Sequence, residues 1–189
     1  MATAVAVTGH RPDSFLVSHY SPETVQRIAE DTIFVLQKQY KDDLILNLGG
    51  AIGADQWAGE ACIALNVRYK LYLPFPPEVQ SKFWSKEHRE ILERQMSKAC
   101  GMEIIDPSGR YHVSKYQERN KRMVDDADFV LAFWVGRRKG GTFNCIKYAL
   151  KESKFVYNAL DENSFTDNRF VVNEDLTKGW RPPTLRGEI

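Results

Sequence analysis

Cysteines, net charge and long apolar runs are scarce in this sequence, and each shortage excludes a class of protein. The three cysteines, Cys62, Cys100 and Cys145, are an odd number and lie far apart. They are therefore expected to be reduced residues in or near the core rather than a disulfide framework. No apolar run approaches the length of a transmembrane helix. The formal net charge of +1 gives no sign of non-specific binding to nucleic acid or to acidic membranes.

Several familiar catalytic and cofactor motifs are also missing. The histidines, His10, His19, His88 and His112, have no metal-ligand spacing with one another or with the cysteines, and we expect no metal or other cofactor. No G-x-S-x-G nucleophile elbow, G-x-G-x-x-G fingerprint or P-loop occurs. The N-terminus leads straight into a strand-like run, without a charged segment and an apolar signal core, so the expected location is the cytoplasm.

What the sequence does contain is a regular alternation of strand-like and helix-like segments. Apolar runs of strand length, separated by segments of helical periodicity, occupy residues 3–8, 44–48, 68–73, 102–105, 128–134 and 155–158. This alternation predicts an α/β fold: a Rossmann-like three-layer domain with a mostly parallel central sheet and helices on both faces. We expect residues 1–160 to form this domain, and residues 161–189 to be a tail packed on it or extending from it.

Two of the predicted strands end in glycine-rich turns that open a helix. The first turn covers residues 49–53, and the second covers residues 136–142 and contains three adjacent cations. A strand that turns on glycines into a helix leaves free backbone N–H groups and the positive end of the helix dipole at the sheet edge. Such a turn favours an anion, most often a phosphate, although each turn alone also fits an ordinary connection between a strand and a helix.

Polar residues stand at the same edge of the predicted sheet, where ligands of open parallel sheets bind. The first strand ends in Gly9-His10-Arg11. Arg11 suits a phosphate or a carboxylate, whereas His10 suits a base, a hydrogen-bond donor or a simple turn residue. Asp55 lies in the first turn of the helix after the first glycine turn, where it either complements the helix dipole or binds a sugar hydroxyl.

Four segments together carry a resemblance to a known family. They are Thr8-Gly9-His10-Arg11, Gly49-Gly50-Ala51-Ile52-Gly53-Ala54-Asp55, Arg119-Asn120-Lys121-Arg122-Met123 and Gly140-Gly141-Thr142. In this order, the set resembles the SLOG superfamily, named for the Smf/DNA-processing and LOG ("lonely guy") proteins, and its small stand-alone bacterial and phage branches above all. The resemblance implies a Rossmann-like sheet that binds a nucleotide or a nucleotide derivative, with phosphate near residues 140–142 and ribose and base near the other loops.

The resemblance also implies a test for one activity. LOG-type members hydrolyse the N-glycosidic bond of a nucleoside 5′-monophosphate, and in them a glutamate closely follows the glycine segment. Arg119 matches their substrate-holding arginine, with Asn120 in place of a lysine, but Phe143 and Asn144 occupy the glutamate position. No carboxylate there activates water, so Asp55 or Asp106 would have to act from another loop, with Asp55 the leading candidate.

Three functions follow from the sequence. The first is a sensor or binding module for a nucleotide or a nucleotide-derived small molecule. The second is a nucleoside 5′-monophosphate N-glycosidase with Asp55 as its catalytic carboxylate. The third is single-stranded DNA binding, against which the near-neutral charge counts. The expected ligand-binding residues are Gly9, His10, Arg11, Gly49, Gly50, Ala51, Gly53, Asp55, Arg119, Asn120, Gly140, Gly141 and Thr142.

Macromolecular partners are less defined by the sequence. We expect no membrane and no nucleic-acid partner. A homodimer is possible, because Trp57, Trp84 and Trp134 suit either a subunit interface or the core.

Overall fold

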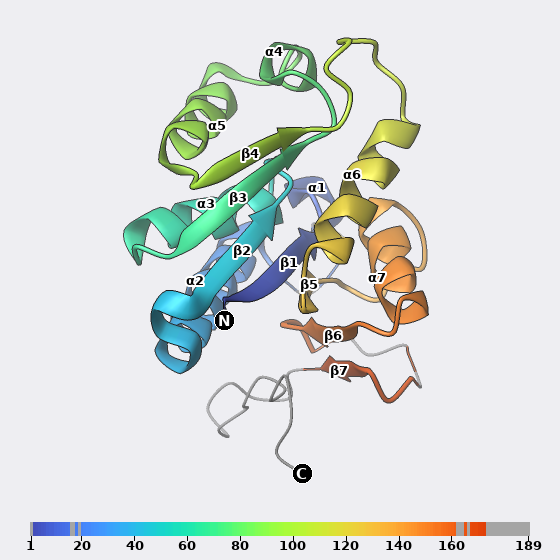
Figure 1. Ribbon diagram of the computed structural model, residues 1–189. Coiled ribbons are helices and arrows are strands. Elements are labelled where there is room, and N and C mark those ends of the chain that lie inside the picture. The colour runs from blue at the N-terminus through green and yellow to red at the C-terminus, as the bar shows by residue number, and fades with distance from the viewer. Residues whose placement is uncertain (1, 16–17, 19, 162–164, 166, 173–189) are drawn as a thin grey trace.

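A parallel sheet organises the chain. The computed structural model describes residues 2–15, 18, 20–161, 165 and 167–172, and in these residues seven strands pair in the order β4-β3-β2-β1-β5-β6-β7 (Figure 1). Every pair is parallel. The strands are β1 (Thr3–Gly9), β2 (Leu44–Leu48), β3 (Arg68–Leu73), β4 (Gly101–Ile104), β5 (Phe129–Phe133), β6 (Phe155–Asn158) and β7 (Phe170–Val172).

Helices cover both faces of this sheet (Figure 1). They are α1 (Pro12–Phe15), α2 (Pro22–Tyr40), α3 (Ala54–Ala64), α4 (Pro77–Gln80), α5 (Lys86–Lys98), α6 (Ser114–Asp125) and α7 (Gly141–Lys151), with a short 3₁₀ turn at Lys41–Asp43. Alternate residues of β1 point to opposite sides. Val5 and Val7 pack in the core formed with α1, α2, α3 and α5, and Ala6 packs in the core formed with α6 and α7. The predicted Rossmann-like three-layer fold is confirmed.

Helix α2 shows how local sequence sets these elements. The Ser21 hydroxyl accepts a hydrogen bond from the Thr24 N–H at 3.2 Å, and Pro22 takes the first helical position, where a missing N–H costs nothing. The apolar side chains of this helix recur at helical spacing, so one face is buried against the sheet. These buried residues include Val25, Ala29, Ile33 and Leu36.

Strand β7 comes from the segment that the sequence indicated only as a polar tail. It pairs with β6 through Val156 opposite Phe170. The Phe170 ring packs against the rings of Trp134 and Phe165, with centroid separations of 5.9 and 4.8 Å. Part of the expected tail therefore belongs to the sheet, while residues 173–189 lie outside the described residues.

The strand order fixes where a ligand can approach. From β1 the chain builds β2, β3 and β4 toward one edge, whereas β5, β6 and β7 continue on the other side of β1. The order therefore reverses between β1 and β5. The connections leaving the carboxyl ends of these two strands diverge to opposite sides, and in open parallel sheets this divergence creates the binding crevice.

Candidate ligand-binding site

A cavity of about 820 Å³ lies where the strand order reverses. It is lined from the loops after β1, β2 and β5, from α6, and from the segment between β4 and α6. Among the residues expected from the sequence, the cavity is lined by Gly9, His10, Arg11, Ala51, Asp55, Arg119, Asn120, Gly140, Gly141 and Thr142. Three others, Gly49, Gly50 and Gly53, are not among its lining residues.

Arg119 of α6 and Asp55 of α3 form a buried ion pair beside the cavity. Their Nη1 and Oδ2 atoms are 3.4 Å apart, and the two side chains are only 7% and 9% exposed. The same Oδ2 atom accepts a hydrogen bond from the Ala51 N–H at 3.3 Å. Burial raises the pKa of the Asp55 carboxyl, whereas Arg119 and the Ala51 amide oppose that rise. The Asp55 carboxylate is thus engaged by the protein itself.

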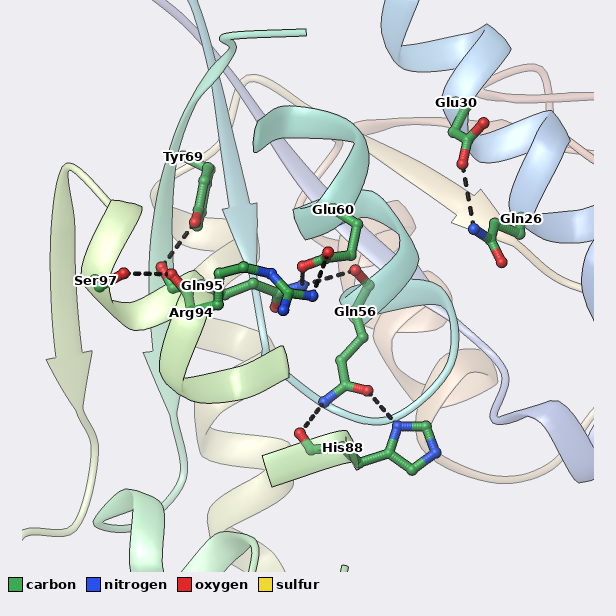
Figure 2. A network of polar contacts seen from close by, with 9 residues as sticks. All are labelled: Gln26, Glu30, Gln56, Glu60, Tyr69, His88, Arg94, Gln95 and Ser97. Carbon is green, nitrogen blue, oxygen red and sulfur yellow. Dashed lines mark hydrogen bonds and ion pairs between the residues drawn. The ribbon is translucent and has the colours of Figure 1, made fainter. Parts of the chain in front are cut away.

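A network of buried amides holds helix α3, and with it Asp55, against helix α5. The Gln95 side-chain amide donates to the Gln56 carbonyl at 2.8 Å and to Glu60 Oε1 at 3.0 Å. The Gln56 side-chain amide in turn donates to the His88 carbonyl at 3.0 Å. Figure 2 shows these side chains converging between the two helices. Gly59 leaves the room that the Gln95 side chain fills, so these two helices are closely joined next to the site.

The first glycine turn is filled by protein groups. A Cβ atom at Gly49 would overlap the Arg119 guanidinium, and one at Gly53 would lie 2.6 Å from the His10 carbonyl oxygen. At the start of α3, the Ala54 N–H donates to the His10 carbonyl at 3.3 Å. The glycines of this turn therefore allow close packing of α6 and the β1 loop.

The second glycine turn is open. Gly140 has a φ of 92° and caps α7 without a side-chain hydrogen bond. A Cβ atom at Gly140 or Gly141 would meet nothing within 4 Å. The first turn of a helix has no intrahelical partners for its N–H groups, and among the described residues no partner is found for those of Gly141 and Thr142. These two N–H groups and the helix dipole are therefore available to an anion from the cavity.

Cations stand beside this open turn on a loop with fixed backbone. Arg137 and Lys139 both line the cavity. The Arg137 carbonyl accepts hydrogen bonds from Trp134 Nε1 at 2.9 Å and from the Lys139 N–H at 2.8 Å. The hydrogen bonds of this loop thus use the backbone carbonyl of Arg137. Among the described residues, its side chain acts on His10 through its charge.

His10 is a neutral group within the cavity wall. It is 7% exposed, and its Nε2 atom has no hydrogen-bond partner in the described part of the chain. Burial, and then the charge of Arg137, lowers its pKa from 6.5 to about 4. At neutral pH the imidazole is therefore uncharged, and its buried Nε2 atom is unsatisfied within the described residues.

The lowered pKa of His10 predicts a pH-dependent stability. Between pH 6.5 and 4 the unfolded chain binds a proton that the folded chain does not, so the free energy of unfolding falls as the pH falls. From pH 7 to pH 5 this contribution is about 2 kcal/mol. Urea denaturation of the wild type and of His10→Gln at both pH values measures it, with His112→Gln as the exposed control. Equal pH dependence of the wild type and His10→Gln would contradict it.

One aromatic residue of the cavity wall, Tyr111, was not predicted from the sequence. Tyr111 lines the cavity and is 67% exposed. Its ring stacks on the buried ring of Phe75, with centroids 5.4 Å apart at 29°, and Tyr116 contacts the same ring edge-on at 5.7 Å. Phe75 follows β3 and Tyr111 follows β4, so the contact depends on distant segments that carry no shared motif.

Two further properties concern metals and membranes. Within the described ranges, no cluster of three or more His, Cys, Asp or Glu residues is arranged to hold a metal ion. Over the same residues, none of the helices has both the length and the apolar character needed to cross a membrane.

The fold and its cavity define a Rossmann-like α/β protein with a candidate ligand site at the sheet's switch point. The model of the YspA SLOG family (YpsA) matches residues 5–162, and the chain belongs to this family. The predicted membership of the SLOG superfamily is confirmed.

Relatives in sequence come from bacilli. The chain is 29% identical over 116 residues to the SPbeta prophage-derived protein YoqJ of Bacillus subtilis (strain 168), covering 54% of this chain and 67% of that protein. It is 23% identical over 154 residues to a UPF0398 protein of Bacillus pumilus (strain SAFR-032), covering 79% of this chain and 81% of that protein.

Solved structures share the fold at lower identity. DNA processing protein A (DprA) of Helicobacter pylori, described for its single-stranded DNA binding mode, has a TM-score of 0.63 at 15% identity, over 93% of this chain and 77% of that one. The molybdenum cofactor carrier protein of Chlamydomonas reinhardtii has a TM-score of 0.59 at 18% identity, over 94% and 92%. For DprA of Streptococcus pneumoniae the TM-score is 0.60 at 16% identity, covering 88% of this chain. The present chain spans only 52%, about half, of that protein. At these identities the likeness concerns the fold alone.

Proposed function

We propose that this protein binds a nucleotide or a nucleotide-derived anion in the cavity between β1 and β5, as a sensor or ligand-binding module. The observation that carries the proposal is the open turn at the start of α7. There the unpartnered N–H groups of Gly141 and Thr142 meet the cations Arg137 and Lys139 around one cavity. Backbone N–H groups at a helix N-terminus, reinforced by cations, are a common phosphate-binding arrangement.

The remaining lining residues support an anionic ligand. Arg11 lies close enough to influence Asp55 electrostatically, and the Arg119 Nε atom is buried without a hydrogen-bond partner in the described residues. Buried donors without partners are rare, and the residue that carries this one also lines the cavity. Structural neighbours with this fold include a molybdenum cofactor carrier and a DprA protein described for its single-stranded DNA binding mode.

Binding is favoured over glycosidic hydrolysis by the state of Asp55. A general base must be free to reach the water that it activates. The Asp55 carboxylate instead contacts Arg119 and the Ala51 N–H, so its role in the proposal is to position Arg119. Single-stranded DNA remains the second candidate ligand, favoured by the fold shared with DprA.

The substitution Gly141→Asp tests the proposal. A carboxylate at this position enters open space, interacts favourably with the helix dipole and repels a phosphate from the same N–H groups. We expect nucleotide affinity to fall by at least about a hundredfold, because two charge-assisted hydrogen bonds are lost. The midpoint temperature of thermal unfolding is expected to stay the same or to rise. Gly141→Asn adds a side chain of similar size without the charge, and we expect it to lose less nucleotide affinity than Gly141→Asp.

Isothermal titration calorimetry with a panel of nucleoside monophosphates measures these affinities. A Gly141→Asp variant that binds as tightly as the wild type would contradict the proposed anion site. Mass spectrometry of the same mixtures detects turnover, and release of free base and ribose phosphate in proportion to protein concentration would replace the binding module with a glycosidase. Tight binding of a single-stranded oligonucleotide alone would favour the second candidate.

A further inference from the structure

The cavity concentrates positive charge in a chain that is nearly neutral. Four cationic side chains line it, from Arg11, Arg119, Arg137 and Lys139, against the single carboxylate of Asp55 among the described lining residues. The lining therefore has an excess of three positive charges, whereas the whole chain has a formal net charge of +1. A concave site with one sign of charge focuses the electrostatic potential on its ligand. One phosphate monoester would neutralise only part of this excess.

These cations come from three different parts of the chain: Arg11 follows β1, Arg119 is in α6, and Arg137 and Lys139 follow β5. Arg137 acts electrostatically on His10, next to the open α7 turn, whereas Arg11 acts on Asp55 and Tyr116. The buried and unpartnered atoms His10 Nε2 and Arg119 Nε belong to the wall near these groups. The site therefore offers polar groups to more than one anionic group, in addition to the helix N-terminus.

The cavity is large, and an exposed aromatic residue forms part of its wall. Small-molecule sites measure roughly 300–1,000 Å³, so a volume of about 820 Å³ is near the upper end. One face of the Tyr111 ring is covered by Phe75, and the residue as a whole is nevertheless 67% exposed. An exposed aromatic face beside a phosphate site is suited to stack on a nucleobase.

We propose that the ligand is a nucleotide with two or more phosphates, whose phosphates lie between the α7 turn and Arg11 and whose base stacks on Tyr111. This inference rests on the proposed function and narrows it from any nucleotide-derived anion to a polyphosphorylated one. The excess of positive charge favours several phosphates, and the exposed Tyr111 ring favours a base. The volume of about 820 Å³ has room for a ligand larger than a nucleoside monophosphate.

Titration calorimetry across a phosphate series tests the inference. The probes are the mono-, di- and triphosphates of adenosine, guanosine, cytidine and uridine, with inorganic pyrophosphate, in a buffer with EDTA and about 150 mM salt. For at least one base, we expect the Kd to fall roughly tenfold from the monophosphate to the diphosphate. We expect pyrophosphate alone to bind at least tenfold more weakly than that diphosphate, because it lacks the stacking ring.

Three variants connect the effect to its residues. The double variant Arg137→Gln/Lys139→Gln is expected to abolish the difference in affinity between mono- and diphosphate. It keeps the two hydrogen bonds that the Arg137 carbonyl accepts, from Trp134 Nε1 and from the backbone N–H of residue 139. Tyr111→Ala is expected to weaken the best nucleotide about tenfold or more, without changing the weak binding of pyrophosphate. Lys151→Gln, at the opposite end of α7 and with its side chain 79% exposed, is the matched control.

The outcomes separate the inference from the function on which it rests. Equal affinity for mono-, di- and triphosphates would overturn the inference and leave nucleotide binding intact. Pyrophosphate bound as tightly as the diphosphates would overturn the role of Tyr111. If no nucleotide of any phosphorylation state binds, the proposed function itself fails.

Discussion

Replacing Gly49 with alanine is expected to lower nucleotide affinity by at least about a hundredfold and the free energy of unfolding by roughly 1–3 kcal/mol. The added Cβ would overlap the Arg119 guanidinium and lie 2.7 Å from Asp55 Oδ2. The backbone at Gly49 does not have a positive φ, so the effect comes from this overlap and not from backbone strain. Arg119 must leave its place, and the ion pair with Asp55 is broken.

Urea denaturation and titration calorimetry measure the two effects of Gly49→Ala. Gly101→Ala is the matched control, because Gly101 is in the edge strand β4 and its Cβ would make only ordinary contact, at 3.4 Å, with the flexible Lys70 side chain. We expect this control to change stability by less than about 0.5 kcal/mol. Unaltered affinity in Gly49→Ala would mean that the position of Arg119 is unimportant to the ligand.

Removal of the Asp55 carboxylate is expected to be more damaging to stability than removal of the whole ion pair. Asp55→Ala leaves the Arg119 guanidinium buried without its counter-charge, which typically costs 3–5 kcal/mol, on the order of a third of a domain's stability. In the double variant Asp55→Ala/Arg119→Met, no buried charge remains. We expect it to regain at least about half of that loss, because apolar replacements of buried ion pairs are often neutral.

Urea denaturation of both single variants and the double variant gives the coupling energy directly. An exposed pair provides the comparison: Arg122 and Glu103 are 3.0 Å apart with side chains 49% and 42% exposed, and Glu103→Ala should cost less than about 1 kcal/mol. If Asp55→Ala loses no more stability than Glu103→Ala does, the buried charge of Arg119 is satisfied by water and the prediction is wrong.

The core of the fold could be predicted because its signals are local. Residues 44–48 form a short apolar run that ends in glycines, and Ser21-Pro22 marks the start of a helix. A few neighbouring residues are therefore enough to predict each element. Residues 3–8 likewise form a short run of small, apolar residues, and they fold as β1. Strand β7 could not be predicted, because its three residues, Phe170–Val172, form a strand only by pairing with β6 and packing on Trp134.

The sequence motifs named many of the residues that line the cavity, but they did not show which of them contact one another. The motifs identified His10, Arg11, Arg119 and the glycine turns, which the fold brings to one edge of the sheet. Sequence alone could not tell which turn is open, because the first is closed by Arg119, whose partner Asp55 is 64 residues away. Tyr111 was missed because its segment has no periodicity, and only the packing on Phe75 gives it a position.

Because several separate loops line the cavity, their sequences can change during evolution independently of the sheet. The loops after β1, β2, β4 and β5 each contribute part of the wall, whereas the residues paired in the sheet lie in the strands themselves. Loop residues add hydrogen bonds at the strand ends, from the His10 N–H to the Phe133 carbonyl and from the Ile105 N–H to the Leu73 carbonyl. Insertions or exchanges in one loop can therefore accumulate without altering the architecture. Ligand preference and fold are inherited through different parts of the chain, so the sheet can persist in descendants whose loops have become unrecognisable.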